Sequence, residues 1–263
     1  MIRKLLAIFA INWSENIYMR GESIIWFLLE LIPTMYIILL WQSMQRNGSI
    51  DEKQYTFMLV YQIVTMVIAR LTGSHFESWV IDNIKEGKIS KSLLQPIPYP
   101  IFLFVLEAVW RLFGFLYFIP IIVMISFTWG NIFLQEIIWK NMGWFLLFMA
   151  LSYIQRYLVS ILIICAGFWT ERAQALSHLK WILEGVLAGS WLPLTFYPLW
   201  IQKISSFTPL YYWYHIPSQI VMIKDFSNIF GFLFGSILWV IILGIFAYFA
   251  WKRSLKHYSA VGA

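Results

Sequence analysis

The chain has 263 residues, of which 60% are hydrophobic, 19% aromatic and only 12% charged. Because about a quarter of the residues in a soluble domain are charged, this composition excludes an ordinary soluble fold and indicates an integral membrane protein. The formal net charge of +6 is not a sign of nucleic-acid binding, since basic residues in a membrane protein report first on its orientation.

The segment 1–22 is expected to form a helix that lies in the membrane interface. Its apolar side chains fall largely on one side of a helical wheel: Ile2, Leu5, Leu6, Phe9, Trp13 and Ile17. A short extension of the first membrane span is the alternative. The segment has no long apolar core and no small-residue cleavage site, so we do not expect a signal peptide.

Six stretches are long and apolar enough to cross a membrane as helices, which takes about 20 residues. They are residues 24–44, 55–78, 101–129, 142–169, 177–199 and 230–251. The fifth is interrupted by glycine and proline, and apolar sequence continues to Pro217. We therefore expect broken, re-entrant helices over 193–217 on the outer face, with the aromatic run 211–214 at headgroup level. The expected fold class is an all-α integral membrane protein, with a single domain over 1–263.

If both termini are cytoplasmic, the segments inside the cell carry about twice as many lysine and arginine residues as the segments outside. This distribution favours both termini in the cytoplasm, together with the loops 79–100 and 170–180.

The segment 79–100, between the second and third spans, carries the densest run of charge in the sequence. Apolar residues recur there at helical spacing and charged residues occupy other faces: Ile84, Ile89, Leu93 and Leu94 against Lys85, Glu86, Lys88 and Lys91. Gly87 interrupts the segment, and three prolines from Pro96 onward end it. Such a kinked amphipathic segment indicates a docking surface, and the alternative is a solvated interfacial loop without a partner.

Charged residues within the spans are candidates for the lining of a pathway: Arg70, Glu107, Arg111, Arg156 and Glu184, accompanied by Glu30, His75 and Glu77. Each costs at least a few kcal/mol in the membrane unless it is paired or hydrated. Depth along the helices matches Arg70 with Glu107 and Arg156 with Glu184, and the spacing of Glu107 and Arg111 favours a pair within one helix. These charges either hold helices together or line a cavity open to the cytoplasm, whereas a proton relay would need a longer chain of carboxylates and histidines.

The sequence carries no motif of a catalytic or metal site. It has no phosphate-binding loop, no His-Glu-x-x-His zinc motif and no Gly-x-Ser-x-Gly nucleophile elbow. The four histidines are scattered, and a single cysteine, Cys165, excludes a disulfide within the chain and a cysteine metal cluster. We therefore expect no metal and no cofactor on this chain, and another chain as the source of energy.

Taken together, these features resemble the permease subunits of type-2 ATP-binding-cassette exporters, and within them the branch of small bacterial permeases without a fused ATPase. The resemblance covers nearly the whole chain: an interfacial N-terminal helix, six spans with both termini inside, a first cytoplasmic loop with a short helix, and broken helices before the last span. Its most specific element is the loop 84–96, where a glycine turn is followed by Leu93, Leu94 and Pro96. The outer stretch with Pro193-Leu194, Pro198-Leu199-Trp200 and Pro209 is also similar to the family's pattern.

The resemblance implies a non-catalytic transport subunit in the bacterial cell membrane, paired with a second permease chain, identical or paralogous, and with ATPase subunits that bind ATP and magnesium. The loop 85–94 would be the coupling helix that docks on the ATPase through Lys85, Glu86, Gly87, Lys88, Ile89, Leu93 and Leu94. Rim contacts would come from the second inner loop, at Glu171, Arg172 and Lys180.

A chain rich in aromatic residues and methionine suits a hydrophobic or amphiphilic substrate, such as a drug, a lipid or a peptide, which the complex would move outward. The main alternative is a stand-alone secondary transporter or channel, in which the intramembrane charges form an ion-coupled pathway. A membrane-embedded enzyme ranks last, because no catalytic constellation supports it.

Overall fold

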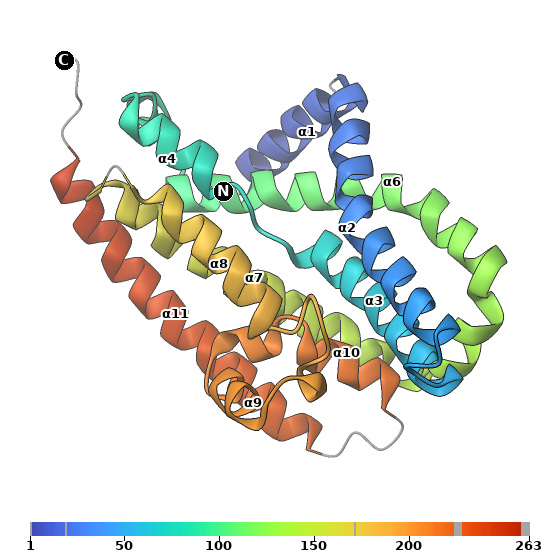
Figure 1. Ribbon diagram of the computed structural model, residues 1–263. Helices are drawn as coiled ribbons and strands as arrows, with labels where there is room; N and C mark the ends of the chain where they lie inside the picture. The colour runs from blue at the N-terminus through green and yellow to red at the C-terminus, as the bar shows by residue number, and fades with distance from the viewer. Residues whose placement is uncertain (1, 19, 171, 224–227, 259–263) are drawn as a thin grey trace.

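The computed structural model describes residues 2–18, 20–170, 172–223 and 228–258, and every regular element among them is helical (Figure 1). The helices, with η for short 3₁₀ turns, are in chain order α1 (Ile2–Tyr18), α2 (Arg20–Arg46), α3 (Glu52–Thr72), α4 (Glu77–Lys85), α5 (Ile89–Leu93), α6 (Tyr99–Glu136), η1 (Trp139–Asn141), α7 (Met142–Gly167), α8 (Gln174–Val186), η2 (Leu194–Phe196), α9 (Leu199–Ser206), η3 (Pro209–Tyr212), α10 (His215–Met222) and α11 (Ile229–His257). The predicted all-α class is confirmed.

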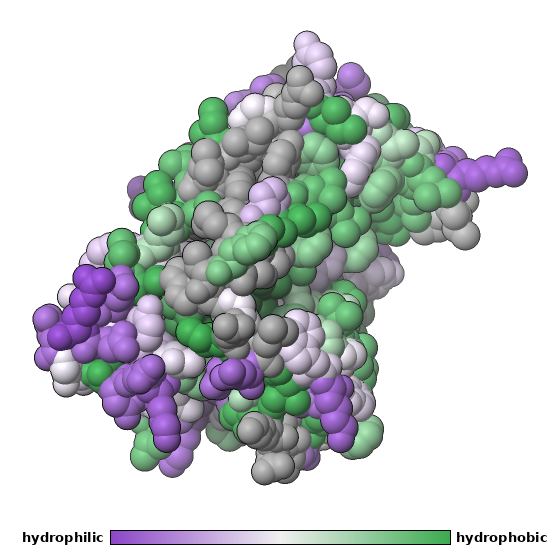
Figure 2. Space-filling model, turned by 90° about the vertical axis from the view of Figure 1, so that its right-hand side faces the viewer, coloured by the Kyte–Doolittle hydropathy of each residue, from purple (hydrophilic) through white to green (hydrophobic). Residues whose placement is uncertain are grey.

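Four segments of the described chain are long and apolar enough to cross a membrane: Glu52–Lys85, Tyr99–Pro120, Trp139–Gly167 and Ile229–His257. They overlap the second, third, fourth and sixth expected spans and make the chain a multi-pass membrane protein. One face of the molecule is mostly apolar over its middle, and hydrophilic side chains gather toward its periphery (Figure 2). The first expected span, 24–44, lies within α2, but several of its side chains fall outside the described residues, so it stays a prediction.

The fifth expected span, 177–199, is wrong as a continuous helix. Helix α8 has 13 residues and ends at Val186, which gives a length of about 20 Å against a hydrocarbon core of about 30 Å. The chain then turns at Gly189, whose φ of 82° lies in the left-handed region that glycine adopts without strain.

The segment that follows α8 consists of the short helices η2, α9, η3 and α10, at the end of the molecule opposite to α4 and α5 (Figure 1). Their re-entry into a membrane stays a prediction. The expected place of the aromatic run at headgroup level is wrong for three of its four residues, because Tyr212, Trp213 and Tyr214 are at most 8% exposed. They belong to an apolar cluster with side chains of α3 and α7, so they fill the protein core.

Helix α7 is the central helix, and it packs against α3, α4, α8, α10 and α11. A helix surrounded by protein is apolar on most sides, and α7 carries buried aliphatic and aromatic residues over most of its length. Its few buried polar side chains, among them Gln155, Arg156 and Ser160, are thereby held in the middle of the protein, where they need partners from neighbouring helices.

Helix α6 is the longest helix, with 38 residues, and it is bent (Figure 1). Pro120 lies inside it, and a proline bends a helix because it removes one backbone hydrogen bond and its ring crowds the preceding turn. Helix α1 packs along α6, where the ring of Trp13 meets that of Phe113 edge-on, with centroids 5.3 Å apart. The predicted N-terminal helix therefore exists, and its place in a membrane interface stays a prediction.

Candidate functional site

The candidate site forms around a break between α3 and α4. A single helix was expected over 55–78, but α3 ends at Thr72 and α4 begins at Glu77. Gly73, a poor helix former, begins the break, and the buried backbone groups within the break need partners outside a helix. The carbonyl of Ser74 obtains one from the Lys180 ammonium of α8.

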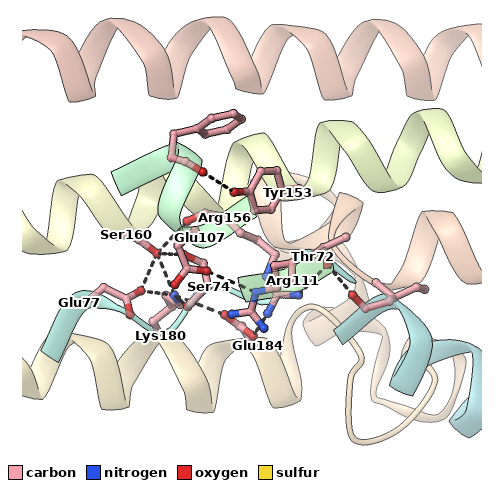
Figure 3. Close-up of polar contacts among 12 residues, drawn as sticks. Thr72, Ser74, Glu77, Glu107, Arg111, Tyr153, Arg156, Ser160, Lys180 and Glu184 are labelled. Atoms are coloured by element: carbon pink, nitrogen blue, oxygen red, sulfur yellow. Dashed lines mark hydrogen bonds and ion pairs between the residues drawn. The ribbon is translucent and has the colours of Figure 1, made fainter. Parts of the chain in front are cut away.

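Lys180 lies at the centre of a buried cluster that joins α4, α7 and α8 (Figure 3). Its ammonium forms an ion pair with Glu77 and donates to the Ser160 hydroxyl at 3.1 Å. Ser160 in turn donates to the Glu77 carboxylate at 2.6 Å. Lys180 is only 5% exposed, so its expected place at the rim of an ATPase contact is wrong.

Arg156 of α7 forms a second cluster beside the first. It is fully buried, and its guanidinium donates to the Glu184 carboxylate at 2.6 Å, which confirms the predicted pair. The same guanidinium lies over the rings of Trp213 and Tyr214, at 5.4 and 4.9 Å from the ring centroids. Glu184 also lies 3.9 Å from Lys180, so the two clusters form one network, with two acidic and two basic members.

Two further charges lie on α6. Arg111 donates to Glu107 through Nε at 3.3 Å, which confirms the predicted pair within one helix. Arg70 of α3 was expected at the depth of Glu107, and its guanidinium lies further along α6, against Gly114. A β-carbon at Gly114 would be 1.7 Å from Arg70 Nη2, so this glycine makes room for the arginine. The side chain of Glu30 falls outside the described residues.

Sequence reasoning missed Lys180, Ser160 and Thr72, whose hydroxyl accepts from Arg156 at 3.2 Å. A signal existed for two of them. Lys180 stands four residues before Glu184, and Ser160 four residues after Arg156, so each shares a helix face with a charge that the sequence had singled out. Lys180 was expected in a cytoplasmic loop, so its position on the same helix face as Glu184 was not recognised.

A cavity of about 500 Å³ opens next to these clusters, between α2, α3, α6 and α8. Its wall combines polar and aromatic side chains, chiefly Gln62, Thr65, Arg70, His75, Arg111, Trp181, Glu184, Trp191 and Tyr214. Arg111 also lines a groove of about 300 Å³ on its other side, where the remaining wall is largely apolar. Three of the five predicted pathway residues therefore line a cavity: Arg70, Arg111 and Glu184. The other two contact lining residues, because Glu107 pairs with Arg111 and Arg156 pairs with Glu184.

The predicted docking loop folds as α4 and α5, joined by a turn at Gly87 with a φ of 71°. Ile84 and Ile89 are 7% and 1% exposed and pack inward, against side chains of α6 and α7. The expectation that Ile89 contacts an ATPase is therefore wrong, because its side chain anchors the loop to the permease. Leu93 is partly buried against the same cluster, whereas Leu94 is 87% exposed.

The loop's outer side is charged and tied to two other helices. Lys85, Glu86 and Lys88 are exposed, and Lys88 pairs with Glu86. Gln174 of α8 donates to Asp82 at 2.6 Å. Tyr258, directly after α11, shares a hydrogen bond with Ser90 at 2.7 Å and donates to the Gly87 carbonyl at 3.3 Å. Arg172, two residues before Gln174, is exposed, and Glu171 lies outside the described residues.

Within the described part of the chain, no group of three or more histidine, cysteine, aspartate or glutamate side chains is placed to hold a metal ion. The arrangement is that of a membrane protein with a paired charge network, a cavity beside it and a tethered polar loop.

Comparison with known proteins identifies the family. The model of the family described as ABC-2 family transporter protein matches residues 28–262, whereas no curated protein is similar enough to match. Proteins of this family are membrane components of transporters, generally without catalytic activity of their own, and the family implies an ABC ATPase partner in general. With a match over nearly its whole length, the chain belongs to the ABC-2 family of transporter proteins.

Proposed function

We propose that this chain is the membrane subunit of an ATP-driven exporter in a bacterial cell membrane, with both termini in the cytoplasm. A separate ATPase binds ATP and magnesium and supplies the energy. A second permease chain completes the pathway, and the substrate is hydrophobic or amphiphilic. Family membership supports the transport role, and the architecture of the loop 79–100 supports the coupling to an ATPase.

The observation that carries the proposal is the division of this loop into an anchored side and an exposed side. Ile84 and Ile89 fix it to α6 and α7, while Leu94 extends outward with 87% of its surface exposed. Leu94 is therefore an apolar side chain of this loop that a partner protein could cover. Force applied to Leu94 would reach Glu77, the first residue of α4, and through it the Lys180 cluster beside the cavity.

The test is the variant Leu94→Asp. A carboxylate in an apolar contact cannot be desolvated cheaply, so we expect the tagged permease to insert into the membrane normally and to lose co-purification with an ATP-binding-cassette ATPase. Leu199→Asp is the matched control, because Leu199 is 74% exposed at the opposite end, where it begins α9. Aspartate is favourable at the start of a helix, and this variant should keep the ATPase.

Undiminished ATPase recovery with Leu94→Asp would overturn the docking surface. Recovery of the wild-type permease alone, in several detergents, would favour the stand-alone secondary transporter instead. Transport assays separate the two readings further, because the exporter stops without ATP and the secondary transporter stops without its ion gradient.

A further inference from the structure

Tyr258 joins the end of α11 to the loop 79–100. It directly follows α11, whose last residues lie at the same end of the molecule as α4 (Figure 1). The tyrosine is partly buried, and its ring packs beside the cluster in which Ile84 and Ile89 anchor the loop. The ring also meets that of Phe168 edge-on, with centroids 5.7 Å apart. Packing of the ring thus places the phenol independently of its hydroxyl.

The Tyr258 hydroxyl closes the turn between α4 and α5. It donates to the Gly87 carbonyl at 3.3 Å. A hydroxyl has one proton but two lone pairs, so Ser90 is the donor in the bond of 2.7 Å between the Ser90 and Tyr258 hydroxyls. The Gly87 carbonyl also accepts from the Ser90 amide, at 3.2 Å. One phenol therefore contacts both the first and the last residue of the turn 87–90.

The turn depends on such contacts because its own elements are short. Helix α5 has five residues, and so short a helix is not stable on its own in water. Gly87, at a φ of 71°, adopts this conformation without strain, but glycine also has the most backbone freedom to lose. The burial of Ile89 and the Tyr258 hydroxyl both hold α5 in place. Leu94 follows α5 directly, so the orientation of α5 sets the direction in which Leu94 points.

The end of α11 is a firm support for this contact. Helix α11 packs along α7. Trp251, about two turns before Tyr258, stacks on Tyr99 at the start of α6, with ring centroids 6.0 Å apart. It also meets Phe168, which follows α7, at 5.8 Å between centroids. Since Phe168 contacts Tyr258 as well, this group of aromatic rings joins α6, α7 and α11 where the tyrosine reaches the turn.

We infer that Tyr258 is a positioning residue for the ATPase contact: its hydroxyl holds the turn at Gly87, and with it the direction in which Leu94 is presented. The inference rests on the proposed docking of an ATPase at this loop, and it deepens that proposal by assigning part of the docking geometry to α11. The turn follows α4 and is tied to α11 through Tyr258, so a partner that moves the turn acts on both helices.

The first test measures the turn itself and needs no ATPase. Tyr258→Phe removes the hydroxyl and keeps the ring on Phe168. In nanodiscs, we expect the backbone amides of 87–90 to exchange with deuterium about twofold to tenfold faster, the factor that corresponds to one hydrogen bond of ordinary strength. Tyr248→Phe is the matched control, because Tyr248 lies on α11 and is 62% exposed. It should exchange at the wild-type rate.

Variants of Ser90 show whether the hydroxyl bond, and not the ring, holds the turn. Ser90→Ala loses the bond to Tyr258 and should also exchange faster, whereas Ser90→Thr retains a hydroxyl and should exchange as wild type does. The double variant Ser90→Ala/Tyr258→Phe should exchange no faster than Tyr258→Phe, because both changes remove the same bond. A ring that only fills space would leave the exchange of all these variants at the wild-type rate.

The second test measures ATPase binding. The ATP-binding-cassette ATPase that co-purifies with the wild-type permease is titrated onto immobilised nanodiscs that contain each variant. Tyr258→Phe should weaken its binding about twofold to tenfold, again the factor of one hydrogen bond. Ser90→Thr and Tyr248→Phe should bind it as wild type does. Leu94→Asp, which alters the contact surface itself, should abolish binding.

Two outcomes would overturn the inference. Wild-type exchange in Tyr258→Phe would exclude the hydroxyl as a tether of the turn. Faster exchange combined with wild-type ATPase affinity would show that the tether does not position the loop for its partner. Failure of the docking proposal appears elsewhere, as undiminished ATPase recovery with Leu94→Asp or as recovery of the wild-type permease alone. The exchange measurement still decides on the tether in that case, so the two proposals fail separately.

Discussion

Arg156 is a charge in the protein's interior that several side chains contact. A fully buried guanidinium would be very unfavourable alone, and it is held by the Glu184 carboxylate, the Thr72 hydroxyl and two aromatic rings. The contacts come from α3, α8 and the segment before α10, so one side chain of α7 connects three other parts of the chain.

This concentration of contacts predicts a large effect when one partner is removed. Glu184→Leu should lower the free energy of unfolding by about 3–5 kcal/mol, because Arg156 then remains charged and buried with less compensation. The double variant Arg156→Met/Glu184→Leu should recover part of the loss, since it leaves no buried charge of the pair. Unfolding in detergent, followed by circular dichroism, measures both.

Glu86→Gln is the comparison for that series. Glu86 also pairs with a basic residue, Lys88, but both side chains are more than half exposed, and such surface pairs contribute little. We expect no measurable change. Equal effects of the Glu86 and Glu184 variants would show that the buried network contributes no more than a surface pair.

At the scale of the elements, the contact between α3 and α6 depends on Gly114. Since a β-carbon there would overlap the buried guanidinium of Arg70, Gly114→Ala should lower the free energy of unfolding by about 1–3 kcal/mol, as other overpacking changes do. Gly143→Ala is the matched variant, because nothing lies within 4 Å of its β-carbon position in α7. It should be neutral or stabilise the protein, by up to about 1 kcal/mol.

Thermal unfolding of the two alanine variants in the same detergent provides the measurement. The opposite order, with Gly143→Ala the less stable, would contradict the close approach of Arg70 to Gly114.

Long apolar helices were predictable, and broken ones were not. Helices α7 and α11 are long apolar stretches whose backbone hydrogen bonds form within each helix, so their existence does not depend on distant contacts. The break after Thr72 depends on Ser74 and Glu77 meeting Lys180, 103 to 106 residues away. A single glycine in an apolar stretch does not reveal such contacts.

An apolar stretch of sequence can lie in the membrane or in the protein core, and the sequence alone does not distinguish the two. Ala188 and Leu194 are buried in the protein, yet they read as part of a membrane span. Trp213 and Tyr214 read as interfacial aromatics and instead pack around Arg156. The pair of Arg156 and Glu184 could be predicted because each residue of a helix adds a constant rise along its axis. The environment of Lys180 could not be predicted, because it depends on where α8 begins.

At the scale of the whole molecule, α4 and α9 lie at opposite ends (Figure 1). The exporter proposal requires that the loop with Lys88 faces the cytoplasm and that α9 with Lys203 faces outward. Both lysines are exposed, and Cys165 is buried, so a single introduced cysteine would be the accessible one. A membrane-impermeant maleimide should label Lys203→Cys on intact cells and Lys88→Cys only in inside-out vesicles. Labelling of both variants from one side would contradict this arrangement.

The hydrogen bonds of Tyr258 have a consequence for biosynthesis. Ser90 and Gly87 leave the ribosome long before their partner, which follows Ser90 by 168 residues. The turn at Gly87 therefore lacks its tether until α11 and Tyr258 have been synthesised. An ATPase that recognises the tethered turn would bind chains in which α11 has already formed in preference to shorter nascent chains, so this hydroxyl would make assembly follow the folding of α11.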